Sequence, residues 1–555
     1  MRRIETDLLV VGGGLAALRA AYDALGAGAR VALAVKGKAG RSGSSAMTSA
    51  GYSAARPTAG DSPEQHYRDT LAGGKGINDA HLVRIMTEEG PEKLRELEAM
   101  GARLAFTEEG EHQVNPSGDH TVPRVFVTEN HTGRDFTEPL TAAVVARGCE
   151  LLEMTAIVEV LVRGGEVVGA VGLDYEQDDL VLIAAPSVIL GTGGAGRLFA
   201  VTSNPNDATG DGYALALGAG ADLRDMEFIQ FYPWRCIIPF ERSRMPIQPS
   251  TFVLGAKLWN SEGERFMLAY DPVRGEHTTR DVAARGIYEQ IRAGKDVRGG
   301  VRLDLSEVSL EDWLRTNPKP ARHFLERGLD VHKEELIIAP EAHFFMGGAA
   351  IDDEGQTRIS GLFAVGEAAG GVHGANRLDS NALPETQVFG ARAGRAAARR
   401  RGRGNGACLE VPAQWESRFR DVLEAPGRPA PVPYADLRKE LQSVMWNRLG
   451  IVRDGEQMEI GLRELDGLEG RLGAVRPAGV RALVNHATLE NSILVARCCF
   501  TAALGRRESR GAHYRRDFPE QDDERWLVAH HVELRDHGSL RRWTTPVQLR
   551  AATVR

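Results

Sequence analysis

The stretch HGANRLDSNAL (373–383) places a histidine, an asparagine and an arginine within five residues. It follows GLFAVGEAAGG (361–371), which has the pattern of a buried strand that runs into a glycine turn. Burying a cationic group with several hydrogen-bond donors costs free energy unless the group binds something negative. We therefore predict that Arg377 belongs to an anion-binding site.

A second chemical signal lies at the N-terminus, in DLLVVGGGLAALRAA (7–21). A β-branched strand is followed by a glycine turn and then by a helix of small residues, which is the order that a dinucleotide fingerprint requires. The glycines allow a tight turn and a close approach to a pyrophosphate at the helix N-terminus. The predicted cofactor-binding residues of this turn are Gly12, Gly13, Gly14, Leu15, Ala16 and Ala17.

The strand that follows argues against a standard NAD site, because it ends in Lys36 where an acid usually holds the adenosine ribose. GTGGAG (191–196) also spells GxGxxG and raises the alternative of a second nucleotide, NADPH. No suitable helix or strand with an acid follows it, so we expect this strand to return to the first sheet. Glu367 then offers a carboxylate to a ribose hydroxyl, and the combination favours FAD over NAD.

Composition narrows the function further. The 555-residue chain has a net charge of -8, which argues against a nucleic-acid surface, and 42% apolar residues, which is typical of an ordered globular protein. Its five cysteines are scattered without a CxxC pair, so we expect neither an iron–sulfur centre nor another metal site in this chain. No apolar run reaches membrane-spanning length, and a strand pattern begins almost at once. We expect a cytoplasmic protein with no direct membrane insertion.

The order of patterns along the chain predicts an α/β fold. Residues 156–184 have the pattern of an antiparallel meander within an otherwise alternating strand and helix region. We expect a Rossmann-like FAD-binding domain (1–225 and 346–402), an inserted capping domain (226–345), and a C-terminal helical domain with a tail (403–555).

Ordered motifs then carry a resemblance that runs nearly end to end. They include GRSGSSAMTSAGYSAA, LGTGGAGRLF, ATGDGYALALGAG, TTRDVAARGI, EAHFFMGGAAID, VGEAAGGVHGANRLDSNAL and RRESRGAHYRRDFPEQDD. The chain resembles the flavoprotein subunits of succinate dehydrogenase and fumarate reductase, and their relative L-aspartate oxidase.

The resemblance implies a set of FAD-binding residues beyond the N-terminal turn. Members of the family that belong to membrane complexes attach FAD covalently to a histidine just after the RS pair. This sequence has Gly43 there and no histidine between residues 1 and 65, so we expect noncovalent FAD. The implied cofactor residues are Lys36, Ser42, Gly43, Ser44, Ser45, Gly51, Gly193, Gly194, Asp211, Glu367, Asn381, Ala382 and Leu383.

The resemblance also implies roles at the substrate. Arg377 matches the arginine that pairs with a substrate carboxylate, and His343 matches the substrate-binding histidine. Arg280 matches the arginine regarded as the proton donor or acceptor opposite the flavin. Because free arginine is a very weak acid, a purely electrostatic role is the alternative, and a surface ion pair with Asp281 is another.

Two departures from the family concern the second carboxylate of a dicarboxylate substrate. Relatives carry a histidine where this chain has Tyr232, and a Thr-Glu pair with an arginine that bind substrate and relay protons where it has IQPSTFVLGAK (247–257). We expect a substrate with one carboxylate on Arg377 and a less charged group toward Tyr232. Alternatively, Arg242 or Arg244 enters the pocket and restores dicarboxylate binding.

The leading hypothesis is an FAD-dependent enzyme of the fumarate reductase and succinate dehydrogenase type that moves a hydride between the flavin and a carboxylate-activated C–C bond of a small organic acid. L-Aspartate oxidase is the alternative favoured by the missing histidine. An electron-transfer protein with an altered substrate site is the third. The FPEQDDERW tail resembles subunits that dock an iron–sulfur protein, which makes such a protein a candidate partner.

Overall fold

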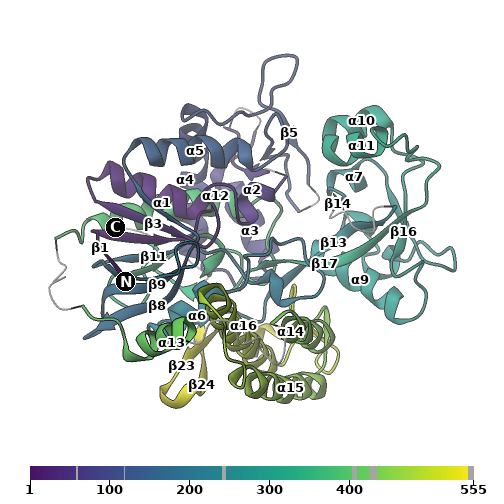
Figure 1. Cartoon of the computed structure of the whole chain (residues 1–555). Coiled ribbons are helices and arrows are strands. Elements are labelled where there is room, and N and C mark those ends of the chain that lie inside the picture. Colours follow the sequence, from purple (N-terminus) through teal and green to yellow (C-terminus); the bar gives the residue numbers. More distant parts are fainter. Residues whose placement is uncertain are drawn as a thin grey trace.

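A computed structural model describes residues 1–49, 51–57, 60–117, 119–239, 245–402, 409–424 and 434–547. Its centre is a parallel sheet of five strands (Figure 1). Their order is β19 (Leu362–Ala364), β11 (Val188–Leu190), β2 (Leu8–Val11), β3 (Val31–Val35) and β7 (Glu150–Glu153).

The apolar run of β2 serves two cores, because neighbouring side chains of a strand point to opposite faces. Leu8 and Val10 pack among the helices α1 (Leu15–Gly26), α4 (Ala80–Ala99), α5 (Arg134–Ala146) and α12 (Ala382–Ala398). Leu9 and Val11 pack toward a second sheet. Burial on both faces explains why the strand shows no polar alternation.

The second sheet contains the predicted antiparallel meander, which is confirmed. Strand β9 (Glu166–Asp174) pairs with β8 (Thr155–Arg163) on one side and with β10 (Asp179–Ala184) on the other. Strand β1 (Arg2–Glu5) adds to β10 in parallel and closes the order β1-β10-β9-β8.

A separate body, teal in Figure 1, stands beside this core and is reached by two long antiparallel strands, β13 (Ile229–Ile238) and β17 (Leu336–Phe345). They extend to the order β14 (Met245–Pro246), β13, β17, β16 (Val301–Asp304) and β15 (Lys257–Trp259). The helices of this capping domain are α7 (Ser250–Val253), α8 (Met267–Tyr270), α9 (Arg280–Arg292), α10 (Leu310–Thr316) and α11 (Pro318–Leu325). It has its own apolar core, around Trp313 and Phe324.

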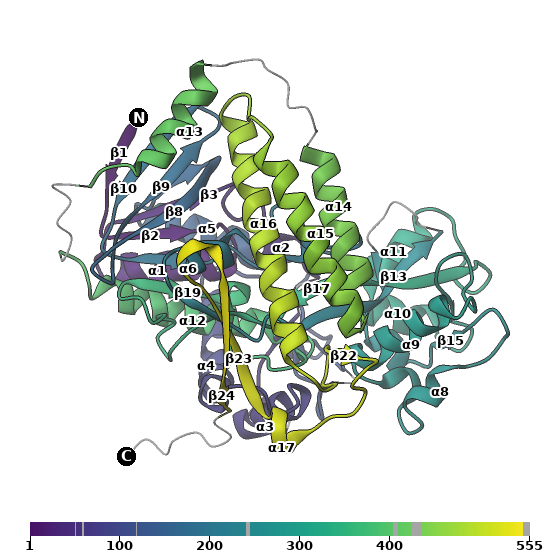
Figure 2. The same ribbon diagram turned by 90° about the horizontal axis from the view of Figure 1, so that it is seen from below.

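The C-terminal region contributes helices and strands. Helices α14 (Tyr434–Leu449), α15 (Gly455–Gly473) and α16 (Val480–Gly505) run side by side (Figure 2), and α13 (Ala413–Glu424) packs against α16. Beyond the expected helices, a hairpin of β23 (Val528–Leu534) and β24 (Leu540–Pro546) joins a sheet with β12 (Asp222–Arg224), β18 (Gly348–Ala350) and β20 (Ala369–Gly370). None of the helices in the described ranges is long and apolar enough to cross a membrane.

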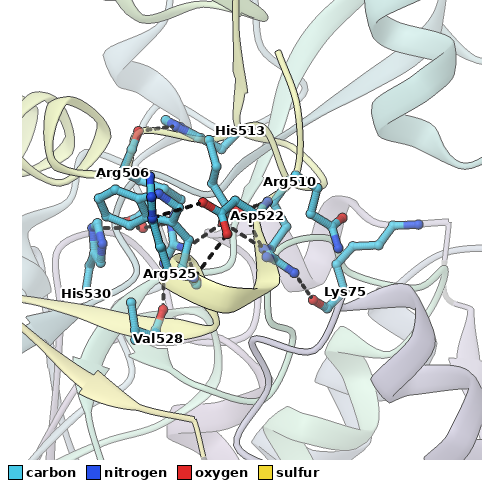
Figure 3. Close-up of polar contacts among 12 residues, drawn as sticks. Lys75, Arg506, Arg510, His513, Asp522, Arg525, Val528 and His530 are labelled. Atoms are coloured by element: carbon cyan, nitrogen blue, oxygen red, sulfur yellow. Dashed lines mark hydrogen bonds and ion pairs between the residues drawn. The ribbon is translucent and has the colours of Figure 1, made fainter. Parts of the chain in front are cut away.

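A buried ion network anchors this C-terminal segment (Figure 3). Arg506 donates to Glu227 over 2.7 Å and to Glu508 over 2.9 Å, and Arg510 donates to Glu508 and to the Lys75 carbonyl. Buried charges of this kind are tolerated because each is paired, so removing one partner destabilises the fold more than the pair contributes. The RRESRG part of the C-terminal motif therefore has a structural use.

Candidate active site

A cavity of ≈ 420 Å³ lies between the FAD-binding elements and the capping domain. Most of the predicted site residues line it. They are Gly12, Gly13, Gly14, Ala16, Lys36, Ser42, Gly43, Ser44, Ser45, Gly51, Gly193, Asp211, Tyr232, Arg280, His343, Glu367, Arg377, Ala382 and Leu383. The other four, Leu15, Ala17, Gly194 and Asn381, are not part of the lining and lie in elements directly behind it.

The two glycine runs meet at one end of the cavity. Gly12 has φ +119°, and a Cβ placed on it would lie 2.2 Å from the carbonyl oxygen of Gly191, so neither chain could approach with a side chain there. A Cβ on Gly191 would in turn lie 2.9 Å from that of Ala17. Strand β11 thus returns beside β2, and only a short 3-10 helix (Gly196–Leu198) follows it, where a second βαβ nucleotide site would need a long one.

Two helix N-termini face the same cavity. Helix α1 begins after Gly14, which has no side chain to cap it, and α12 begins after Asn381, whose side chain makes no capping bond. The Asn381 amide donates instead to Thr70 Oγ over 3.0 Å and lies 2.8 Å from His66 Nε2. Backbone N–H groups at the starts of two helices, with the positive ends of their dipoles, make a ready anion site.

Lys36 and Asp211 come together across the cavity wall. Lys36 Nζ lies 2.6 Å from Asp211 Oδ2, and Asn491 donates to Asp211 Oδ1 over 3.0 Å. Burial alone would raise the pKa of Asp211, but the Lys36 ammonium and hydrogen bonds from Asn491 and Thr209 hold that pKa below its ordinary value. Asp211 is therefore an anion at neutral pH, and Lys36 is occupied by it.

Glu367 points into the cavity near the second glycine run. Its Oε1 accepts from the Phe345 N–H over 3.0 Å, and a Cβ on Gly194 would lie 2.1 Å from that oxygen. Gly194 is thus a glycine because the Glu367 carboxyl occupies its side-chain space. Burial raises the pKa of Glu367 to about 7.

At the other end of the cavity, two arginines converge on one amide. Arg280, the first residue of α9, donates to Gln230 Oε1 over 3.2 Å, and Arg377 donates to the same oxygen over 3.1 Å. The Gln230 amide nitrogen donates to Asn376 Oδ1 over 2.9 Å and to the Arg377 carbonyl over 2.7 Å. Sequence reasoning missed Gln230, although it stands in the same QFYP motif as Tyr232.

Arg280 is buried, with 2% of its surface exposed, and its ion-pair partner is Asp379. The alternative of a surface ion pair with Asp281 is therefore wrong. Asp379 was also missed; it lies in the NRLDSNAL stretch, and a charged residue between Arg377 and the start of a buried helix was the available signal.

His343 lies on β17 with its ring in the cavity wall. Its Nδ1 lies 2.7 Å from Ser203 Oγ. Burial, assisted by the nearby charges of Arg377 and Arg280, lowers the pKa of His343 well below its ordinary value. A neutral imidazole held at Nδ1 by a hydroxyl leaves Nε2 for a ligand.

Tyr232 lines the cavity, but its hydroxyl donates to the Ile247 carbonyl over 2.7 Å. The phenol thus braces the 245–250 segment, and its ring, 5.1 Å from both the His343 ring centroid and the Arg280 guanidinium carbon, is what faces the cavity. Glu341 completes this wall, with Arg235 Nε at 3.8 Å from its carboxylate. Arg242 and Arg244, the alternative carboxylate ligands, lie outside the described residues.

Residues 7–383 match a family model described as an FAD binding domain, and residues 438–554 match one described as the fumarate reductase flavoprotein C-terminus. The flavin-type relative in Methanothermobacter marburgensis, a component of its fumarate reductase (CoM/CoB), is 40% identical over 527 residues, covering 93% of this chain and 95% of that protein. The L-aspartate oxidase of Streptomyces coelicolor is 34% identical over 546 residues, covering 96% and 92%.

Among solved structures, the FrdA chain of a mutant E. coli quinol fumarate reductase superposes with a TM-score of 0.91 at 30% identity, covering 100% of this chain and 98% of that one. The glycine cradle, the two open helix N-termini and the Glu367 carboxylate fit the FAD that this likeness implies. The chain belongs to the FAD-dependent flavoproteins of the fumarate reductase and succinate dehydrogenase type, whose relatives include L-aspartate oxidase.

Proposed function

We propose that the protein moves a hydride between FAD and a carbon–carbon bond activated by a neighbouring carboxylate in a small organic acid. The observation that carries the proposal is the convergence of Arg280 and Arg377 on Gln230 beside His343, in the same cavity as the glycine cradle. Two guanidinium groups and a neutral imidazole form a site for a carboxylate, next to the place where a flavin would lie.

Each side chain has a task in this proposal. Arg377 holds the substrate carboxylate through its planar fork, and His343 donates from Nε2 to the same group. Arg280 faces the carbon that gains or loses a proton. When bound, the flavin supplies the hydride chemistry, and the protein contributes orientation and a preorganised positive field.

The FAD of this protein is noncovalent in our proposal. Gly43 stands at the attachment position with φ +87° and has no side chain to form a bond. FAD affinity then depends on the pyrophosphate site at α1 and on polar contacts along the cavity, including those offered by Asp211 and Glu367.

The far wall supports a substrate with one carboxylate. Tyr232 has committed its only donor to Ile247, and Glu341 adds a carboxylate to that wall. A second substrate carboxylate would lose most of its charge-assisted partners there, which costs about 3 kcal/mol and weakens binding about a hundredfold. The preferred substrate therefore carries an uncharged group toward Tyr232.

Glu341 also supports a second candidate, an L-aspartate oxidase type of reaction, because a carboxylate in the wall can hold a substrate amino group. Relatives of this chain include L-aspartate oxidases at 34% identity. Steady hydrogen peroxide release on adding L-aspartate under air would select this candidate, and its absence would leave the first.

An electron-transfer protein is a further part of the proposal. In the C-terminal tail Phe518 is 37% exposed, and acidic residues follow it at 520–524. An exposed apolar side chain beside carboxylates suits a partner with a basic rim, and an iron–sulfur protein is the candidate. A cytoplasmic protein could be held at a membrane through such a partner.

The function is tested with the FAD-loaded protein and reduced viologen as the electron donor, without oxygen. A panel of unsaturated mono-acids, fumarate and a saturated control acid is supplied, and viologen oxidation is followed. We expect turnover with a mono-acid that exceeds the turnover with fumarate. Absence of turnover with every unsaturated acid, in protein that holds FAD, would contradict the proposal.

A further inference from the structure

Arg280 is surrounded by carboxylates that come from two segments far apart in sequence. The resemblance assigns proton relay in relatives to an acid and an arginine of a segment that here reads IQPSTFVLGAK (247–257) and contains neither. In the structure, Asp379 of the NRLDSNAL stretch pairs with Arg280, and Asp119 of the SGDH stretch acts on Arg280 electrostatically. The chain therefore carries acids at this arginine by another route.

Asp379 is the nearer of the two carboxylates. It lines the cavity, and its backbone carbonyl accepts from Ser53 Oγ over 2.9 Å and lies 2.8 Å from His120 Nε2, which fixes the residue in place. Burial opposes ionisation of Asp379, but Arg280, Arg377 and His120 hold its pKa below the ordinary value. Asp379 is a proton acceptor that stays charged at rest.

Asp119 lies behind Asp379 and does not line the cavity. The residue as a whole is partly exposed, whereas its Oδ2 is buried and has no hydrogen-bond partner. Its carboxylate also receives a hydrogen bond from the backbone N–H of Asp379. One carboxyl group thus contacts the Asp379 backbone on one side and reaches solvent on the other.

The charges that face Asp119 tune its proton affinity. Burial raises its pKa to about 6, the Arg280 charge opposes this rise, and Asp379 and Asp281 add to it. An acid with a pKa near the working pH can both give and regain a proton readily. Asp119 therefore has the properties of an entry point for protons.

We propose that Asp119 and Asp379 form the path by which protons reach and leave Arg280, an inference that rests on the proposed function. In the reducing direction the substrate takes a hydride from reduced flavin at one carbon and a proton from Arg280 at the other. The neutral guanidine regains its proton from Asp379, Asp379 regains it from Asp119, and Asp119 regains it from water. In the oxidising direction each proton moves the opposite way.

The inference is tested in the FAD-loaded protein with the unsaturated acid that turns over best. We expect Asp119→Asn and Asp379→Asn to lower kcat about a hundredfold, with FAD content and the Kd of the acid within about threefold of the parent. The limb of the reducing pH profile near pH 6, on which activity falls as Asp119 loses its proton, should vanish in Asp119→Asn. Its solvent deuterium isotope effect on kcat should increase.

Asp281→Asn is the matched control, because Asp281 adjoins Arg280 but is not on the path; its kcat should stay within about threefold. Because Asp119 is partly exposed, added formate should restore activity to Asp119→Asn and not to Arg280→Lys. A readout without turnover is infrared titration of the FAD-free protein, in which a protonated carboxyl band that disappears near pH 6 should be missing from Asp119→Asn.

The outcomes separate the two proposals. If the parent reduces no unsaturated acid, the proposed function fails. If the parent turns over while Asp119→Asn keeps its kcat, its pH limb and its infrared band, the relay is overturned and the function stands. Loss of activity that formate does not restore, with an unchanged isotope effect, would also overturn the relay.

Discussion

Arg280 and Arg377 donate to the same amide oxygen, Gln230 Oε1, over 3.2 and 3.1 Å. Two buried guanidinium groups would repel one another, and burial together with the Arg280 charge lowers the pKa of Arg377 to about 10. A neutral acceptor between them orients both without cancelling their charge. The positive field is thereby left for the substrate.

Replacing this acceptor by a carboxylate should remove that field. In Gln230→Glu we expect the Kd of a substrate carboxylate to rise about a hundredfold, because the new charge pairs with both arginines. FAD content should not change. Gln248→Glu on the opposite wall is the control and should alter mono-acid binding only slightly. Equal Kd values for the parent and Gln230→Glu, from flavin absorbance titration, would count against the site.

Arg280→Lys should keep a positive charge and lose the planar fork. We expect FAD content and the thermal midpoint to persist while kcat falls by about a thousandfold or more. Arg285→Lys on the same helix, where Arg285 stacks 4.5 Å from the Tyr514 ring, is the matched control with near-normal kcat. Parent-like activity in Arg280→Lys would show that another group handles the proton.

Tyr232→Phe should affect stability more than chemistry. The variant loses the hydrogen bond to the Ile247 carbonyl, so the free energy of unfolding should fall by about 1 kcal/mol while kcat stays within about threefold. Denaturant unfolding and steady-state kinetics on the same preparation check this. A large loss of kcat at unchanged stability would show that the hydroxyl acts on the substrate.

Acid precipitation should release all of the yellow colour into the supernatant, because Gly43 offers no attachment atom. Among the described residues, His131 and His343 are the histidines that line the cavity. A protein pellet that stays fluorescent on a denaturing gel would contradict noncovalent binding. Loss of that fluorescence in His131→Ala would then locate the bond.

FAD affinity should increase with pH through Glu367. Burial raises the pKa of this carboxyl to about 7 in the FAD-free protein, and a ribose hydroxyl can donate only to its ionised form. Binding then releases a proton, so below pH 7 the affinity should fall about tenfold per pH unit. Glu367→Gln should bind FAD without this slope. Asp211, whose pKa is already low, should contribute none, and a slope that persists in Glu367→Gln would contradict the assignment.

The sequence was sufficient for features that depend on local pattern. The apolar runs of β2 and β3, the glycine turn after β2 and the meander at 156–184 are set by neighbouring residues, and each is found in the structure. The fingerprint residues around Gly12 and Gly14 lie at the cavity for the same reason.

Features that depend on pairing across the chain were not predictable. Gln230 and Arg377 are 147 residues apart, and the Lys36–Asp211 pair spans 175 residues. The commitment of the Tyr232 hydroxyl to Ile247 depends on a strand bend that no spacing rule encodes. The hairpin β23–β24 lies in the expected tail, where its strand pattern is short and its partner, β12, stands some 300 residues earlier.

The central claim is that the reduced protein passes a hydride to an unsaturated acid held by Arg377 and protonated through Arg280. Photoreduced, FAD-loaded protein is mixed without oxygen with an unsaturated mono-acid in a stopped-flow instrument, and flavin absorbance is recorded. The account predicts rapid reoxidation that saturates with acid concentration in the parent and is slowed by about a thousandfold in Arg280→Lys. Flavin that stays reduced with every unsaturated acid, and reoxidises only when oxygen is admitted, would contradict it.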